Sequence, residues 1–569
     1  MSSSPTDENL DHKKNEFHEM LLENESVSGK KGEMAYDDVL EHLGEFGRYQ
    51  RRIYFLLCLP AISCAFHKLV GVFIQARVPY RCKLSWESSN SNYGYLGNNI
   101  TVMSTYYPVD QMTHSFSGCR VLDPRSNSTS ECDTWIYDRS NYESTTLTEW
   151  DLVCQRAWWK ASADAIFMVG VLLGSIIFGA LSDKYGRKII FFISLLLQAF
   201  AGVLTGLAPN YFIFVTFRMI VGAATSGVFL VAYVLALEMV GPKTRMFAGV
   251  ACQMFFTTGY IMTALFAYYI RNWRWLEIAV SLPGLLFISY YWFIPESARW
   301  LLTKERRDEA EKILESVAKE NKVQIPPELL RNLLTRNEVV TTKVADENQS
   351  TVLDLFKTPY LRLKTLIILY LWFVNSATYY GLSWNTGNLA GNEYVNFVLS
   401  GLVEYPAYIF LLLTLNRWGR KFVLCGSMIV AGLALISNLF IPVELAWLGV
   451  TTAMIGKLAI TASYGTVYIF TAEQFPTVIR NVGMGAGSTF ARVGGILAPY
   501  INILTEIYTP LPLIVFGLLS LSSVFFALWL PETLNKKLPD TIVDGEKFGR
   551  KPKLADESNE IPIEQRSGS

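Results

Sequence analysis

Twelve long apolar stretches separated by short polar loops constrain the fold of this chain more than any other feature. The stretches cover residues 53–74, 163–182, 189–208, 211–239, 246–270, 275–294, 361–384, 393–415, 421–441, 445–471, 482–505 and 511–530. A helix needs roughly 20 apolar residues to cross a bilayer core of about 30 Å. A soluble chain of 569 residues would instead form several domains with alternating polar and apolar positions. The sequence therefore predicts an all-α membrane protein with twelve transmembrane helices.

Composition and motifs argue against several functional classes. The formal net charge is zero, and the basic patch of a nucleic-acid-binding domain is missing. The sequence contains no Walker loop, so ATP-driven pumping has no support. The five histidines show no metal-ligand spacing, and no catalytic Ser/His/Asp or Cys/His arrangement stands out. We therefore expect no enzyme activity, cofactor, metal or nucleic-acid partner.

The charges of the short loops predict the orientation, because basic loops stay in the cytoplasm. The loops after the second, fourth, eighth and tenth stretches contain DKYGRK, GPKTR, NRWGRK and PTVIRN. The loops of the other side, such as GLAPN and IPVE, lack Lys and Arg, with Arg271 and Arg274 as an exception. Twelve spans then leave both termini in the cytoplasm.

This topology divides the chain into five parts. They are a cytoplasmic segment 1–52, a six-helix bundle 53–295 with an extracellular loop 75–160, a cytoplasmic linker 296–360, a second six-helix bundle 361–531, and a cytoplasmic tail 532–569.

The predicted extracellular loop carries two independent marks of an oxidising, secreted environment. Four cysteines, Cys82, Cys119, Cys132 and Cys154, fall within it and allow three disulfide pairings. Two glycosylation sequons begin at Asn99 and Asn127. Both marks agree with the side that the loop charges predict.

The two halves repeat the same motifs in the same order. YGRK at 185–188 recurs as WGRK at 418–421, EMVGPKTR at 238–245 as EQFPTVIR at 473–480, and PES at 295–297 as PET at 531–533. Arg218 and Lys457 form a looser pair. An even number of spans per repeat gives both copies the same orientation, and the substrate site of such folds lies between the halves near the membrane midplane.

The loop GALSDKYGRK at 179–188 resembles the signature between the second and third helices of major facilitator transporters. In it, Gly186 permits a tight turn, Arg187 holds the loop in the cytoplasm, and Asp183 can lock one conformation. The alternative is a topology anchor with no switching role.

Further motifs resemble the organic cation and carnitine transporter family, with the look of an insect-type member. They are QMFFTTGY, NWRWLEIAVSLPG, YYWFIPESARWLL, LVEYPAY, TAEQFPTVIRN and ARVGGILAPY. The resemblance covers nearly the whole chain. It implies a major facilitator fold with two pseudo-symmetric bundles that moves small organic ions by alternating access.

Ionisable residues inside spans usually face a partner or a cavity. We expect those that follow the repeat to form a structural or conformational charge network near the cytoplasmic ends. With the loop residues, the set is Asp183, Gly186, Arg187, Arg218, Glu238, Arg245, Lys457, Glu473 and Arg480.

Glu404 and Arg492 do not follow the repeat and are candidate substrate contacts. The resemblance places Glu404 among acidic residues that face the cavity of cation transporters, whereas an arginine at 492 is typical of anion and carnitine-type members. Arginine binds a carboxylate bidentately, so the pair would suit a zwitterion. A hydrogen-bonded packing role for Glu404 and an internal salt bridge for Arg492 are the alternatives.

Polar and aromatic residues complete the predicted substrate site. By resemblance Phe229, Tyr233 and Tyr379 match cavity-lining positions, and Tyr380 and Gln253 are similar candidates. Aromatic faces attract quaternary ammonium groups by about 0.5–2 kcal/mol each, but packing is the alternative for each ring. Lys68 in the first span either snorkels outward or contributes to an outer vestibule.

The leading hypothesis is a plasma-membrane transporter of small organic cations or carnitine-like zwitterions, expected to work as a monomer, with oligomers left open. Uniport, sodium or proton symport and exchange are open as coupling modes. The alternatives are an organic anion transporter of the same family and a non-transporting receptor or sensor on the same fold.

Overall fold

The computed structural model describes residues 36–88, 93, 100–109, 116–124, 128–335 and 351–550. Six spans of its N-terminal half are α2–α4 (Arg48–Cys58, Pro60–Leu69, Gly71–Ile74), α8 (Ala157–Tyr185), α9 (Arg187–Gly206), α10 (Tyr211–Glu238), α11 (Arg245–Tyr269) and α12 with η3 (Trp273–Leu286, Phe287–Trp292). Six more are α17 (Pro359–Trp384), α18–α19 (Glu393–Leu402, Glu404–Trp418), α20 (Arg420–Ile436), α21 (Ala446–Gln474), α22 (Arg480–Ile503) and α23 (Leu511–Ala527). Each overlaps one predicted apolar stretch, so the twelve-helix prediction is confirmed.

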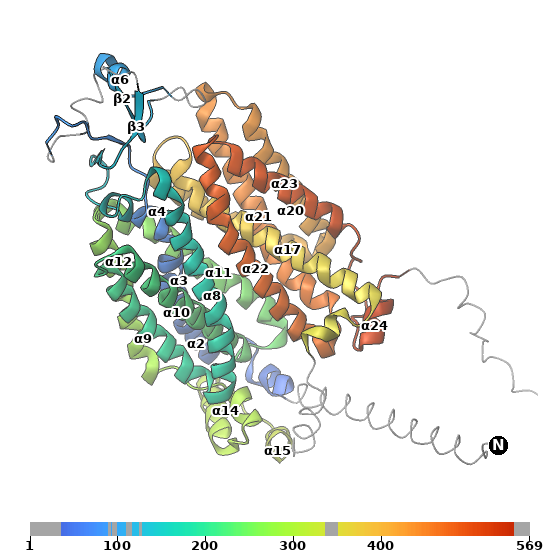
Figure 1. The fold of residues 1–569 in the computed structure, drawn as a ribbon. Coiled ribbons are helices and arrows are strands. Elements are labelled where there is room, and N and C mark those ends of the chain that lie inside the picture. The colour runs from blue at the N-terminus through green and yellow to red at the C-terminus, as the bar shows by residue number, and fades with distance from the viewer. Residues whose placement is uncertain are drawn as a thin grey trace, which may run out of the picture.

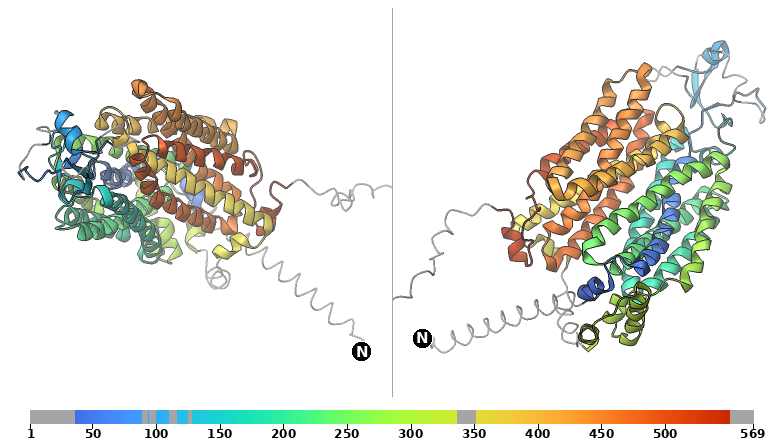
Figure 2. Two further views of the ribbon diagram at one scale, coloured as in Figure 1. Left: turned by 45° about the horizontal axis from the view of Figure 1, so that its top comes forward. Right: turned by 180° about the vertical axis from the view of Figure 1, so that it is seen from behind.

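The spans form two bundles that lie side by side, as Figure 1 and the rear view in Figure 2 show. Within the described residues, nine spans meet both a length and a hydropathy threshold for crossing a membrane, and α23 is shorter but apolar. Each bundle has its own buried apolar core, one around Phe191 and Leu235 and the other around Trp372 and Phe516.

Proline explains where two spans are interrupted. Pro60 begins α3 directly after the end of α2, and Pro406 lies in the first turn of α19, just after α18 ends. Proline has no N–H for the helical ladder and its ring clashes with the preceding turn. Lys68 lies in α3, and Glu404 is the first residue of α19.

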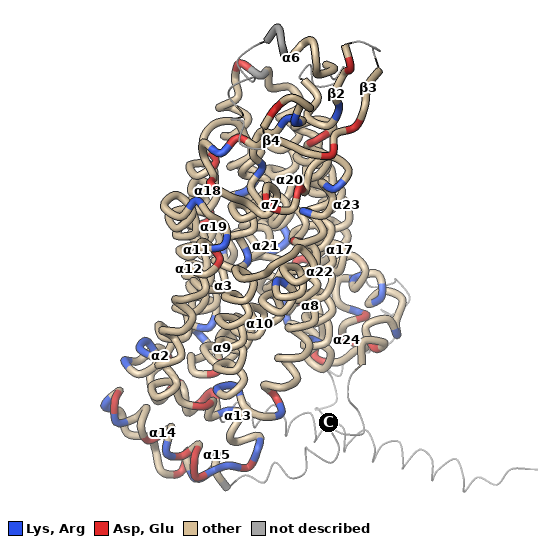
Figure 3. The backbone as a smooth tube through the Cα atoms, turned by 60° about the vertical axis from the view of Figure 1, so that its left-hand side comes forward, with Lys and Arg blue, Asp and Glu red and all other residues tan. Residues whose placement is uncertain are grey.

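The outer surface of the spans is apolar. Phe200, Leu286 and Phe440 expose 62, 73 and 78% of their surface. Exposed apolar surface on this scale is unusual for a soluble monomer and is expected where hydrocarbon is the solvent. Charged residues gather at the two ends of the molecule, with a small number inside the bundles (Figure 3).

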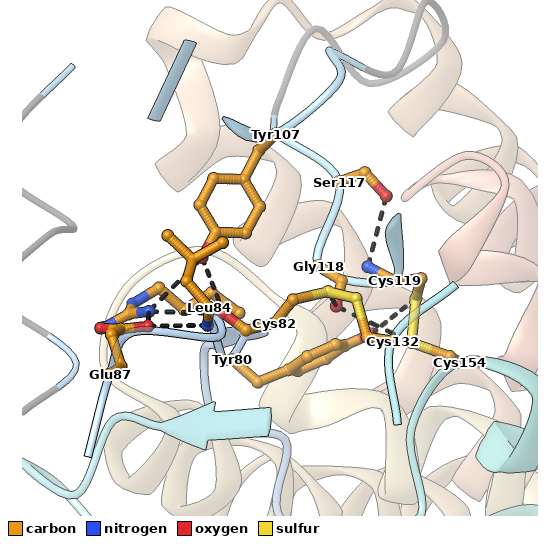
Figure 4. Close-up of a disulfide and its surroundings, with 11 residues drawn as sticks. Tyr80, Cys82, Leu84, Glu87, Tyr107, Ser117, Gly118, Cys119, Cys132 and Cys154 are labelled. Carbon is orange, nitrogen blue, oxygen red and sulfur yellow. Dashed lines mark hydrogen bonds and ion pairs between the residues drawn. A yellow bond between two sulfur atoms is a disulfide. The ribbon is translucent and has the colours of Figure 1, made fainter. Parts of the chain in front are cut away.

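At one end of the molecule, the segment between the first and second spans folds into a small disulfide-bonded cap. We call this end of the molecule the loop side. β1 (Tyr80–Cys82) pairs antiparallel with β4 (Trp135–Tyr137), and β2 (Arg120–Asp123) with β3 (Ser128–Glu131). Of the three pairings, the structure has Cys82–Cys132 and Cys119–Cys154, both beside Gly118 (Figure 4). Asn99 and Asn127 lie outside the described residues.

The opposite end, the terminal side, carries the first and last described residues and the helices between the halves. These helices are α13 (Ala298–Thr303), α14 (Arg307–Asn321), α15 (Pro327–Thr335) and η4 (Val352–Phe356). Residues 36–43 dock here, where Tyr36 donates to the Glu238 carbonyl oxygen and Arg245 pairs with Asp37 at 2.5 Å. Near the C-terminus, α24 (Ile542–Lys547) docks on α17 through the Gly545 carbonyl, which accepts from Lys364.

The cap contains a buried ion pair whose titration is testable. Arg81 Nη2 lies 2.6 Å from Glu87 Oε1, and both side chains are 2% exposed. Burial raises the pKa of Glu87, but hydrogen bonds from Arg81 and the Leu84 N–H outweigh it and leave that pKa below its ordinary value. A lowered pKa means that the pair stabilises the cap above the ordinary carboxyl pKa of about 4.3, and that this is lost as the pH falls through the lowered pKa.

We therefore expect Glu87→Gln to speed hydrogen exchange of residues 80–88 at pH 6, by an amount corresponding to about 1.5–3 kcal/mol for a charge-assisted hydrogen bond. The difference from the wild type should shrink as the pH falls through the lowered pKa of Glu87. A difference that stays constant with pH would contradict this assignment.

A candidate substrate cavity between the two halves

A polar and aromatic cavity lies between the bundles, near the middle of their helices. Its volume is about 130 Å³, roughly ten times what one water molecule requires. The lining residues come from both halves: Lys68, Met168, Val171, Phe229, Gln253, Phe256, Ser376, Tyr379, Tyr380, Tyr408, Thr461, Tyr464, Gly465, Tyr468, Ala491 and Arg492. The cavity is therefore built by contact of the repeats, as the repeat pattern predicts.

Five of the seven predicted substrate contacts line this cavity, namely Arg492, Phe229, Gln253, Tyr379 and Tyr380. Tyr233 stacks on Phe229 with ring centroids 6.3 Å apart and does not reach the wall. Glu404 is fully buried behind the wall.

Several lining residues were missed in the sequence, although a pattern marks them. Thr461, Tyr464, Gly465 and Tyr468 recur at spacings of three and four along α21, so they share one helix face. A polar and aromatic stripe in an apolar span is a recognisable signal. Lys68 belongs to the wall as well, because its side chain points between the halves rather than outward.

Glu404 forms a closed buried cluster with Lys457. Their charged atoms lie 3.1 Å apart, and the Tyr379 and Thr257 hydroxyls each donate to the carboxylate at 2.6 Å. Lys457 also donates to Ser383 Oγ at 2.6 Å and lies over the Tyr379 ring. Both oxygens of the carboxylate therefore accept hydrogen bonds from protein groups. Tyr379 also lines the cavity and so connects this cluster to it.

Arg492 has a different environment. Its Nη1 donates to the Ser488 carbonyl oxygen at 2.7 Å, one turn earlier in α22. Among the described residues it forms no salt bridge, and it is half-buried at the cavity wall. The guanidinium is therefore held by its own helix and presents its charge to the cavity.

The N-terminal half buries a second charge cluster. Arg218 lies 3.7 Å from Glu277 Oε1, and His67 Nδ1 lies 3.5 Å from the same oxygen. The guanidinium also stacks over Phe167 at 4.5 Å and donates to the His67 carbonyl oxygen. Arg218 and Lys457 occupy the halves of α10 and α21 nearer the loop side, whereas the sequence placed the network near the other end.

The repeated motifs close each half at the terminal side by the same device. Glu296 Oε1 accepts from the backbone N–H groups of Arg187 and Lys188 at 3.0 and 3.1 Å. Glu532 accepts from those of Arg420 and Lys421 at 3.1 and 3.0 Å. A carboxylate at a helix N-terminus satisfies unpaired N–H groups and complements the helix dipole.

Salt bridges complete this device in each half. Arg187 lies 3.5 Å from Glu238 and also contacts Asp183, and Arg420 lies 3.0 Å from Glu473. The equivalent Arg245 and Arg480 differ: Arg245 pairs with Asp37 of the docked segment 36–43, whereas Arg480 donates to Thr477 Oγ1. Asp183, Gly186, Arg187, Glu238 and Glu473 are thus brought together within their own halves.

On the loop side the two halves touch each other directly. Arg77 pairs with Glu506 at 3.2 Å, Ser162 Oγ lies 3.1 Å from the Tyr500 hydroxyl, and the Phe73 and Phe397 rings are 4.8 Å apart. Trp384 Nε1 donates to the Lys68 carbonyl oxygen at 3.2 Å. These contacts cover the cavity from the loop side.

Two bundles of membrane-spanning helices around a central cavity define a membrane transporter. Among the described residues, no group of three or more His, Cys, Asp or Glu side chains is arranged to hold a metal ion.

Comparison with known proteins agrees with this class. Residues 95–541 match the sugar (and other) transporter family. The chain is 56% identical to the organic cation transporter protein of Drosophila melanogaster, over 94% of this chain and 99% of the relative. It is 35% identical to human organic cation/carnitine transporter 2, over 89 and 93%, and 37% identical to bovine solute carrier family 22 member 1, over 91 and 94%.

Solved structures show the same fold. The inward-open xylose transporter XylE from E. coli superposes with a TM-score of 0.57 at 13% identity, covering 88% of this chain and 99% of that one. The chain therefore belongs to solute carrier family 22, the organic cation transporters, within the major facilitator superfamily. The family resemblance predicted from the motifs is confirmed; this is a family of membrane transporters and not of enzymes.

The Glu404–Lys457 pair predicts a coupled stability effect. Lys457→Met leaves a buried carboxylate without its counter-charge, which costs about 3–5 kcal/mol. Adding Glu404→Gln removes that charge, so the double variant should regain more than half of the loss. Thermal unfolding of the purified protein measures this, with surface Lys304→Met as control. A double variant no more stable than Lys457→Met would contradict the pairing.

Gly186 predicts a second stability effect. Its backbone has φ 114° and ψ 151°, a region that is essentially restricted to glycine. An added Cβ would also lie 2.5 Å from Glu296 Oε2. Gly186→Ala should therefore lose about 1–3 kcal/mol of stability.

The matched control is Gly426→Ala in α20, where an added Cβ meets no atom within 4 Å and alanine is the better helix former. It should be neutral or stabilising in the same unfolding measurement. Equal losses in both variants would contradict the capping role of the Gly186 turn.

Proposed function

We propose that this protein transports small organic cations or carnitine-like zwitterions across the plasma membrane by alternating access. The observation that carries the proposal is the aromatic and polar cavity shared by the two halves. The relatives named organic cation transporter and organic cation/carnitine transporter support this substrate class.

The lining residues suit an organic ion better than a neutral sugar. Tyr464 and Tyr468 line the cavity with Phe229 and Phe256, and an aromatic face contributes about 0.5–2 kcal/mol to binding an ammonium group. Gln253 and Ser376 offer hydrogen bonds for a polar substituent. We assign substrate contact to these residues and to Arg492, Tyr379 and Tyr380. Glu404 acts on substrate through Tyr379, and Tyr233 through Phe229.

We further propose that the loop side is extracellular and that both termini are cytoplasmic. The disulfides of the cap support an oxidising exterior, and the basic GRK loops support a cytoplasmic terminal side. With the loop-side contacts formed, the cavity would exchange substrate with the cytoplasm. Rocking of the bundles would break those contacts and close the other end.

The test is uptake by purified protein in liposomes. A labelled quaternary ammonium compound and carnitine should both enter with saturable kinetics. Thr461 lines the cavity, so Thr461→Trp should fill it and lower the initial uptake rate at least tenfold.

The matched control is Leu265→Trp, because Leu265 is 56% exposed on the outer surface of α11. This variant should transport at the wild-type rate. Uptake of organic anions alone would overturn the substrate class, and equal rates in the two tryptophan variants would overturn the assignment of the cavity.

A further inference from the structure

The cavity wall carries charge of one sign. Lys68 and Arg492 line it, and none of the described residues that line it is Asp or Glu. Glu404 is fully buried against Lys457, so the positive charge of Lys457 compensates the carboxylate and the cavity receives little net negative charge from it. A substrate therefore meets two cationic side chains and no carboxylate.

The ammonium group of Lys68 lies among three aromatic rings of the cavity wall. Its Nζ lies 5.6 Å from the Phe229 ring centroid, 5.5 Å from that of Phe256 and 5.9 Å from that of Tyr380. Three rings within about 6 Å form the kind of cage that recognises quaternary ammonium ligands. The cage joins both halves, because Phe229 and Phe256 come from one bundle and Tyr380 from the other.

The Lys68 ammonium is held there weakly. It lies 3.5 Å from the Tyr380 hydroxyl, a long contact for a charged donor. Within the described part of the chain it forms no salt bridge. An ammonium group desolvated against rings and without a counter-ion attracts an anion strongly, because the local dielectric constant is lower than that of water.

Arg492 supplies the second half of an anion site. Only Nη1 is used by Ser488 in the described structure, which leaves Nε and Nη2 to meet a ligand. The planar fork of a guanidinium matches the two oxygens of a carboxylate.

We propose that Lys68 determines substrate specificity as a tethered cation. It fills the aromatic cage and, together with Arg492, selects substrates that carry a carboxylate. A zwitterion places its carboxylate toward Lys68 and Arg492 and its ammonium against the remaining rings, including Tyr464 and Tyr468. A permanent cation without an anionic group must displace Lys68 from the cage and is disfavoured. This inference rests on the proposed function and narrows it to carboxylate-bearing substrates.

The test is binding to the purified full-length protein in detergent, with L-carnitine and tetraethylammonium as probes. The wild type should bind carnitine more tightly. Lys68→Met should weaken carnitine binding at least tenfold and tighten tetraethylammonium binding at least threefold, so that the ratio of dissociation constants shifts at least 30-fold. Lys68→Arg should preserve the wild-type order.

The matched control is Lys184→Met, which removes a lysine stacked over Tyr185 at 5.1 Å outside the cavity; it should leave both constants unchanged. If Lys68→Met unfolds, Lys68→Gln replaces it. An unchanged ratio in a folded Lys68 variant, or a wild type that binds neither probe, overturns the proposal.

Uptake by liposomes separates this inference from the proposed function. If Lys68→Met shifts the ratio of dissociation constants as expected but the wild type transports neither probe, the result overturns the proposed transport and supports the specificity role of Lys68. A wild type that moves both probes, with a ratio insensitive to Lys68, overturns the specificity role alone.

Discussion

The structure depends on one constraint, which is that hydrocarbon offers no water to polar groups. Backbone N–H and C=O groups are therefore paired within the helices that make up the spans, apart from the turns that proline interrupts. Buried side-chain charges follow the same rule. Lys457 neutralises Glu404, and Arg218 lies between Glu277 and Phe167. Lys68 and Arg492 depart from this pattern, because they face the cavity without a carboxylate. We infer that the carboxylate of a bound ligand supplies the negative charge that the protein does not provide at these two residues.

The repeated motifs make each half a rigid unit. In both halves, a glutamate after the sixth span caps the third span and meets a glycine turn with positive φ. A neighbouring arginine pairs with a glutamate at the end of the fourth span. These bonds tie three spans of one half to each other and none to the other half. Motion between the halves can therefore proceed without breaking them, as alternating access requires.

The contacts between the halves are of a different kind. Near the loop side they are single ion pairs, long hydrogen bonds and ring edges, such as Arg77 with Glu506 and Phe73 with Phe397. The exposed Arg77–Glu506 pair is worth about 0–1 kcal/mol. Deeper between the halves, α11 and α18–α19 share buried hydrogen bonds, from Thr257 to Glu404 at 2.6 Å and from Tyr260 to Ser400 at 2.9 Å. Movement of one half against the other therefore has to exchange these bonds as well as the weak loop-side contacts.

The sequence by itself determined the twelve spans, the repeat and the family, because the hydrocarbon thickness fixes helix length and the motifs recur in order. It also indicated Phe229, Tyr379 and Arg492 as residues near the centre. The tertiary structure alone decided the disulfide pairing, the burial of Glu404 by Lys457 and the entry of Lys68 into the aromatic cage. The disulfide pairing depends on how the strands of the cap pair. The other two features depend on which face a helix turns toward the other bundle. Packing across the halves sets that face, and hydropathy along the chain carries no information about it.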